Sequence, residues 1–82
     1  MATNRPEWAS GAEWEGWRYH FEYETHSMNR TISEEGPTMV IYGDGTLSIN
    51  SDDGSEVCID CKSTADALNA ANALAEAAGG WS

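Results

Sequence analysis

The sequence is poor in basic residues. Four Lys and Arg stand against 14 Asp and Glu, which gives a formal charge of −10 at neutral pH. Direct binding to nucleic acid needs clustered Lys and Arg that displace counterions from phosphates. Here the basic residues are scattered singly, as Arg5, Arg18, Arg30 and Lys62. We therefore expect no direct binding to nucleic acid or to an anionic membrane. Instead we expect a protein partner with a basic surface.

Long apolar runs are also missing. No stretch approaches the roughly 20 residues that span a bilayer. The first eight residues lack the basic segment and the apolar stretch of a secretory signal. The expected compartment is the cytoplasm, where both cysteines stay reduced. With 82 residues the chain has room for one domain, 1–82.

Cysteine is scarce, and its spacing raises one question of chemistry. Cys58 and Cys61 form a C-x-x-C just before a predicted helix, a spacing found in redox dithiols and in half of a zinc site. The other zinc ligands would be His20 and His26. A four-stranded meander places their strand about 14 Å away, too far for zinc bonds of about 2.0–2.3 Å. We expect two reduced cysteines, with Cys61 facing inward, and keep a zinc or thiol protein as an alternative.

The sequence contains no recognisable catalytic set. A Ser, His and Asp triad is not indicated, and a glycine-rich phosphate loop is missing. The paired carboxylates Glu34–Glu35 and Asp52–Asp53 lie in predicted turns, where water solvates them and leaves their pKa values outside the working range of an acid–base catalyst. We expect a protein that is not an enzyme and that needs no cofactor.

Alternation of apolar and polar residues predicts a sheet. From Trp17 the period is two, with Trp17, Tyr19, Phe21 and Tyr23 on the core face. A polar stretch, 26–37, interrupts the pattern. Strands follow at 38–42 and 46–50 around the turn Gly43-Asp44-Gly45, and at 56–61. These segments predict a four-stranded antiparallel sheet over residues 17–61.

A single helix is predicted at the C-terminal end, over 63–78. Ser63 suits its N-cap and Asp66 its first turn, and Gly79-Gly80 provides the stop. An apolar stripe packs the helix on one face of the sheet and consists of Leu68, Ala71, Leu74, Ala75 and Ala78. The expected fold class is therefore α+β. Residues 1–16 form an irregular or short-helical leader with no assigned burial.

The face of the sheet that one helix cannot cover is the expected binding surface. By alternation this open face carries Arg18, His20, Glu22, Glu24, Val40, Tyr42, Ser48, Asn50, Glu56, Cys58 and Asp60. It reads as acidic with an apolar centre. The candidate partner-binding residues are Glu22, Glu24, Tyr42, Asp52, Asp53, Glu56, Asp60 and, as an aromatic anchor from the leader, Trp14. An alternative is a structural module that forms a homodimer through the open face.

In size, acidity and sheet-plus-helix plan the chain resembles the small inhibitor or accessory proteins of bacteriophages, anti-CRISPR proteins among them. The resemblance implies that the protein acts in the host cytoplasm, where it blocks a host enzyme or defence complex by occupying its surface. Carboxylates along the sheet and turns would stand where nucleic-acid phosphates stand in a target's groove. No motif is shared with a particular member, so the resemblance assigns no residue a role.

Overall fold

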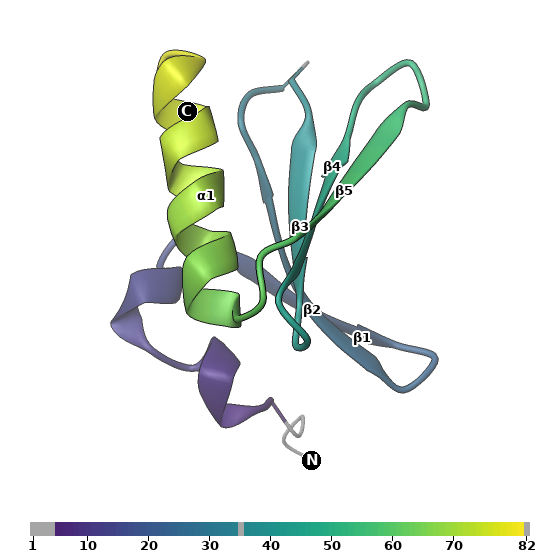
Figure 1. Ribbon diagram of the computed structural model, residues 1–82, viewed down its shortest axis with the longest axis vertical. Coiled ribbons are helices and arrows are strands. Elements are labelled where there is room, and N and C mark those ends of the chain that lie inside the picture. The colour runs from purple at the N-terminus through teal and green to yellow at the C-terminus, as the bar shows by residue number, and fades with distance from the viewer. Residues whose placement is uncertain (1–4, 35, 82) are drawn as a thin grey trace.

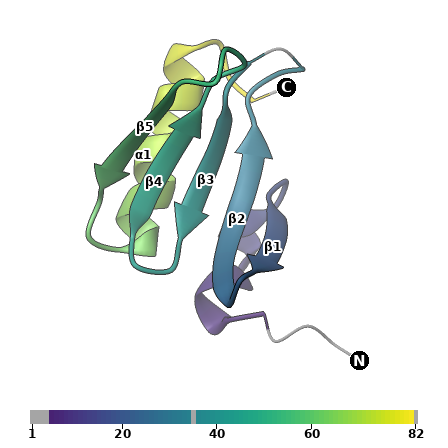
Figure 2. The same cartoon turned by 90° about the vertical axis from the view of Figure 1, so that its right-hand side faces the viewer.

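A computed structural model of the protein describes residues 5–34 and 36–81 and has an α+β fold. The sheet is an antiparallel meander in the order β1-β2-β3-β4-β5. Its strands are β1 (Arg18–Glu22), β2 (Thr25–Thr31), β3 (Thr38–Tyr42), β4 (Thr46–Asn50) and β5 (Glu56–Asp60). The helix α1 (Thr64–Ala77) packs along one face, against β3 and β4 (Figure 1). Figure 2 looks onto the other face, with α1 behind the sheet.

The sheet has five strands, so the prediction of four was wrong. All of the extra strand β2 except its first residue, Thr25, lies in the stretch 26–37 that we expected to be an interruption. Its helix-facing positions include His26 and Arg30, which no hydrophobic pattern marks as inward. The structure accommodates both by aromatic contacts: His26 stacks on Tyr19, and the Arg30 guanidinium lies 4.3 Å from the Trp81 ring centre. Only Met28, which is fully buried, carries an ordinary core signal.

The connection between β1 and β2 explains why the first strand is shorter than predicted. Glu22 pairs with Thr25, so Tyr23 and Glu24 form a two-residue hairpin turn. Both have positive φ, 53° and 60°. Such turns match the strand twist but are normally made by Asn and Gly. The sequence therefore gave no turn signal here. The placement of Tyr23 on the core face and of Glu24 on a strand was wrong.

The helix follows the prediction closely. The Ser63 hydroxyl accepts a hydrogen bond from the Asp66 backbone N–H at 3.1 Å, which confirms the N-cap. Ala67, Ala71 and Ala75 are completely buried against the sheet, where small side chains let the helix axis approach closely. Two stripe positions differ from expectation. Leu74 and Ala78 lie at the flank of the stripe and are exposed.

The described part of the leader, from residue 5, contributes Trp8, Ala9 and Trp14 to the core. It forms two short 3-10 turns, η1 (Glu7–Ala9) and η2 (Ala12–Trp14), which lie below α1 in Figure 1. Only 3% of Trp14 is exposed, and its ring nitrogen donates a hydrogen bond to the Trp8 carbonyl. The expectation that Trp14 is a surface anchor was therefore wrong, because the small core uses this ring for packing.

The four tryptophans form a continuous edge-to-face series. Ring centres are 5.7 Å apart for Trp8 and Trp14, 5.4 Å for Trp14 and Trp17, and 5.3 Å for Trp17 and Trp81. Such pairs stabilise by about 0.5–1.5 kcal/mol each beyond the burial of their area. The series ties the leader and the segment after α1 to the start of β1. Within the described residues, no helix is both long and apolar enough to cross a membrane.

Candidate functional site

The open face differs in composition from the expectation. The unpredicted strand β2 adds four uncharged polar residues to it: Thr25, Ser27, Asn29 and Thr31. One row across the sheet shows the result and runs Arg18, Asn29, Val40, Ser48 and Cys58. Carboxylates stand only on the two outer strands, Glu22 on β1 and Glu56 and Asp60 on β5. The open face therefore has an uncharged middle, an acidic edge on β5, and a mixed edge on β1, where Arg18 and His20 accompany Glu22.

The predicted contact residues are spread over this surface. Glu22 and Tyr42 line one pocket, and Glu24 lies in the turn beside it. Glu56 and Asp60 are on β5, at the far edge of the same face. Asp52 and Asp53 lie in the β4–β5 turn, at the end of the meander opposite the β1–β2 turn. Glu35, which belongs to one of the two acidic pairs expected in turns, lies outside the described residues.

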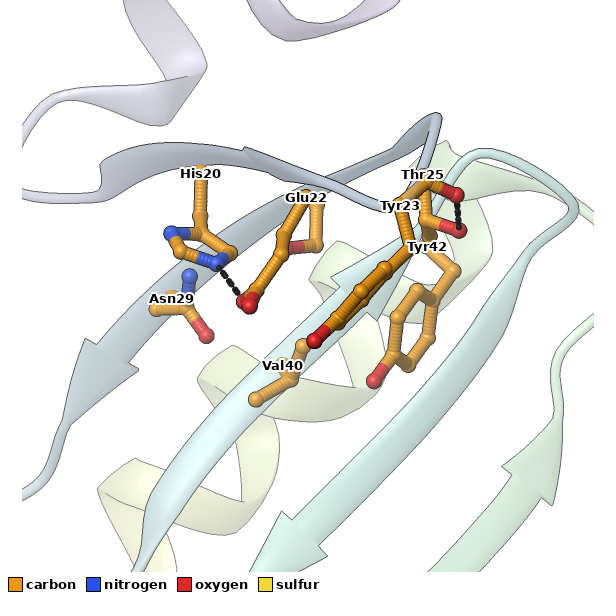
Figure 3. Close-up of a pocket in the computed structure, with 8 residues that line it drawn as sticks. His20, Glu22, Tyr23, Thr25, Asn29, Val40 and Tyr42 are labelled. Atoms are coloured by element: carbon orange, nitrogen blue, oxygen red, sulfur yellow. Dashed lines mark hydrogen bonds and ion pairs between the residues drawn. The ribbon is translucent and has the colours of Figure 1, made fainter.

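The pocket on the open face has a volume of about 320 Å³ and opens at the β1–β2 end of the sheet. Its lining consists of His20, Glu22, Tyr23, Thr25, Ser27, Asn29, Val40 and Tyr42. In Figure 3 the rings of Tyr23 and Tyr42 lie side by side, and Glu22 lies between His20 and Tyr23. Glu22 Oε1 is 2.9 Å from His20 Nε2. The pocket thus combines two phenol rings with one carboxylate.

Sequence reasoning missed Tyr23 as well as the three pocket residues that come from β2. Tyr23 is 90% exposed, the highest value among the large hydrophobic residues that the structure describes. The left-handed conformation of Tyr23 and Glu24 costs about 1–2 kcal/mol per residue. A hydrogen bond from the Thr25 hydroxyl to the Tyr23 carbonyl, at 3.3 Å, helps to hold the turn. Strained backbone of this kind clusters at binding sites. The turn therefore indicates a functional site, which the alternation of apolar and polar residues did not reveal.

Inside the described residues, the basic side chains do not neutralise the carboxylates. The one ion pair there is His20 with Glu22, which requires a protonated imidazole. Arg5 donates to the Ala9 carbonyl, and its guanidinium lies 5.4 Å from the Tyr19 ring centre. Arg30 donates to the Glu15 carbonyl and covers Trp81. Arg5 and Arg30 thus serve carbonyl groups and rings, and within the described residues Arg18 and Lys62 form no ion pair, so the acidic groups keep their negative field.

Several of the carboxylates have a local structural role. The Thr46 backbone N–H donates to Asp44 at 2.9 Å and holds the pKa of that carboxyl below its ordinary value. The Ser55 backbone N–H does the same for the pKa of Asp53, also at 2.9 Å. Asp60 accepts from the Lys62 backbone N–H at 3.0 Å. These groups shape their turns, so their position is explained without a partner.

The four candidate zinc ligands are not brought together. His20 and His26 lie on β1 and β2, and Cys58 on β5, at the opposite edge of a five-stranded sheet. Four strand spacings of about 4.8 Å separate β1 from β5. Cys58 is exposed on the open face, whereas Cys61 packs partly against the core, as predicted. Among the residues that the structure describes, no group of three His, Cys, Asp or Glu is placed to hold a metal ion.

Comparisons with protein-family models, with curated proteins and with solved structures give no match. Function is therefore inferred from the geometry of the open face. An arginine or lysine suits the pocket chemically, because aromatic faces attract cations and a carboxylate accepts charge-assisted hydrogen bonds. The planar guanidinium can do both at once, stacking on a ring while its edge donates to the carboxylate.

Proposed function

We propose that this protein binds a basic protein surface without catalysing a reaction, and that the pocket receives one Arg or Lys side chain of the partner. One observation carries the proposal. A strained turn holds Tyr23 almost fully exposed beside Glu22 and Tyr42, although an exposed ring contributes little to a core. Because the strained turn does not improve packing of the core, we interpret it as holding Tyr23 in position for contact with a partner.

The energies fit a contact that needs support from the rest of the surface. A cation–π contact at an exposed site contributes about 0.5–1 kcal/mol. A hydrogen bond to a charged group contributes about 1.5–3 kcal/mol. One side chain therefore gives weak binding by itself. The net charge of −10 adds long-range attraction, which raises the association rate and favours basic partners.

Occupying a basic surface would exclude the ligands that the partner otherwise binds, nucleic acid among them. An inhibitor that mimics nucleic acid acts in this way, and we propose the same action for this protein. A host defence complex is one class of target. The unneutralised carboxylates of the turns support this extension. A homodimer through the open face is less favoured, because it would bring two copies of the same negative pocket together.

The experiment is an NMR titration of the ¹⁵N-labelled protein with a blocked nona-arginine peptide at low salt. The proposal predicts that the largest shift changes fall on Tyr23, Glu22 and Tyr42, and that they disappear at high salt. A nona-lysine peptide tests the preference for the planar guanidinium, and a nona-glutamate peptide is the control. Shift changes spread evenly over the acidic turns and α1 would show binding to net charge alone, against the proposed pocket.

A further inference from the structure

The strand β5 is an edge of the sheet that nothing in the described structure covers. All five of its residues are exposed. A row of helix-facing side chains shows the abrupt change: Met28, Ile41 and Leu47 are completely buried, and the row ends at Ile59, which is 39% exposed. In the neighbouring row Met39 is buried, whereas Val57 is 55% exposed. The core is thus cut off at β5.

The helix leaves an apolar side chain at the same edge. Asn72 accepts a hydrogen bond from the Trp81 ring nitrogen at 3.0 Å, so its flank of α1 faces the tryptophan series. Leu74 is two residues further on, a rotation of about 200°, which places it on the opposite flank, toward β5. Its side chain is 40% exposed. Val57 and Ile59, the two exposed apolar side chains on the helix side of β5, form what we name the edge strip.

Backbone hydrogen bonds fix which groups of β5 point away from the sheet. The Cys61 N–H donates to the Gly45 carbonyl, and the Ser51 N–H donates to the Ser55 carbonyl. Hydrogen-bonded and non-hydrogen-bonded pairs alternate along an antiparallel pair of strands. In the register of β4 and β5, the N–H and C=O groups of Val57 and Ile59 therefore point toward β4. The outward groups are therefore those of Glu56, Cys58 and Asp60, three N–H and three C=O groups in a row.

β5 carries negative charge at its two ends, Glu56 and Asp60, but lacks the other usual protections of an edge strand. Natural edges carry Lys, Pro, a bulge or an inward-pointing charge, which prevents another strand from pairing. The strand Glu-Val-Cys-Ile-Asp has neither Lys nor Pro, and its two helix-facing residues are apolar. Its register with β4 is continuous over all five residues, without a bulge. The edge is therefore competent to pair with a further strand.

Charge decides against a second copy of the same chain as that strand. In the antiparallel register that pairs all five residues of both copies, Glu56 of each copy lies directly opposite Asp60 of the other. Like charges in directly opposed positions destabilise a strand pair. A strand with basic residues at those positions gains two favourable pairs instead. Its alternate side chains point to the helix side, where the edge strip offers apolar contact.

We propose that β5 accepts an extended segment of a basic partner as a sixth strand of the sheet. The segment alternates Lys or Arg, which face Glu56 and Asp60, with Val or Ile, which pack on the edge strip. Backbone hydrogen bonds to β5 supply affinity, and the alternating side chains supply specificity. The inference rests on the proposed function only in that the partner is basic. It uses a different surface from the pocket.

The test uses the blocked peptide Lys-Val-Lys-Val-Lys-Val-Lys and amide hydrogen exchange measured by NMR. In the free protein the outward amides of Glu56, Cys58 and Asp60 exchange quickly, because they have no backbone partner. The proposal predicts that saturating peptide slows their exchange by at least about tenfold. Unchanged exchange at these three amides overturns it. A peptide of the same composition with its Lys and Val residues in separate blocks is the control for charge alone.

Two changes test the strand pairing itself. In Cys58→Pro the outward N–H is lost while the hydrogen bonds between β4 and β5 remain, and the matched control Cys58→Thr keeps the N–H. We expect Cys58→Pro to abolish protection and Cys58→Thr to retain it. If Cys58→Pro does not fold, a peptide N-methylated on the amides that face β5 replaces it, with the protein unchanged. Equal protection by the methylated and unmethylated peptides overturns the proposal.

The two proposals fail separately in these experiments. Protection of β5 amides by the Lys-Val peptide, without nona-arginine shifts at Tyr23 and Tyr42, supports the edge and rejects the pocket. Shifts in the pocket without protection on β5 reject the edge and keep the pocket.

Discussion

At the scale of single residues, the tryptophans show how a scarce core is completed. Trp14 is buried between Trp8 and Trp17, in contact with both rings. Its removal leaves a cavity that its neighbours, themselves rigid rings, cannot fill. We expect Trp14→Ala to lower the free energy of unfolding by about 3–5 kcal/mol.

Urea denaturation measures this effect. The matched control is Tyr23→Ala, whose exposed ring makes its loss nearly neutral to stability. A loss below about 1 kcal/mol for Trp14→Ala would mean that the ring is not part of the core.

Burial of individual rings could not be predicted from the sequence. Trp14 and Tyr23 are both aromatic and both adjoin Glu residues, yet the first is in the core and the second in solvent. The difference arises from backbone conformation. The 3-10 turn at Ala12–Trp14 directs Trp14 inward, and the left-handed turn directs Tyr23 outward. Neither conformation has a signature in the residue types that adopt it.

At the scale of elements, strong local signals were sufficient where they exist. The helix, its cap at Ser63 and the hairpin around Gly45 were all predicted. Gly45 has φ of +93°, and a Cβ there would lie 2.5 Å from the Ser63 backbone nitrogen, so only glycine fits. The strand β2 was missed because two of its three helix-facing side chains, His26 and Arg30, are polar and contact aromatic rings, and only Met28 is apolar. The pocket was missed with it, since β2 contributes three of its lining residues.

The β1–β2 turn allows a prediction about its strain. Replacement of Tyr23 by Asn and of Glu24 by Gly installs the residues that tolerate positive φ. We expect the double variant Tyr23→Asn/Glu24→Gly to be more stable than the natural protein by about 1–2 kcal/mol. We also expect it to bind nona-arginine more weakly, because it lacks the ring.

Thermal and urea denaturation, together with the peptide titration, check both parts of this expectation. The single variant Glu24→Gly separates them, since it relieves strain and leaves Tyr23 in place. Unchanged stability in both variants would show that the turn is not strained.

At the scale of the whole molecule, the placement of charge departs from a simple acidic face. Carboxylates occur in the leader, in each hairpin turn and on α1 as well as on the sheet edges. Net charge was readable from the sequence, but its distribution depends on the strand order and on the turns. The general negative field would attract basic partners, and we propose the pocket and the β5 edge as the places where such partners bind.

We propose that a cationic side chain of the partner binds at Glu22 and its tyrosine neighbours. The most direct measurement compares two variants that each remove one negative charge, Glu22→Gln in the pocket and Glu76→Gln on the exposed side of α1. Calorimetry with nona-arginine gives the affinity of each. We expect Glu22→Gln to bind the peptide about fivefold more weakly, because its hydrogen bond to the guanidinium loses about 1 kcal/mol without the negative charge. We expect Glu76→Gln to weaken binding less than twofold. Equal losses in the two variants would contradict the proposal.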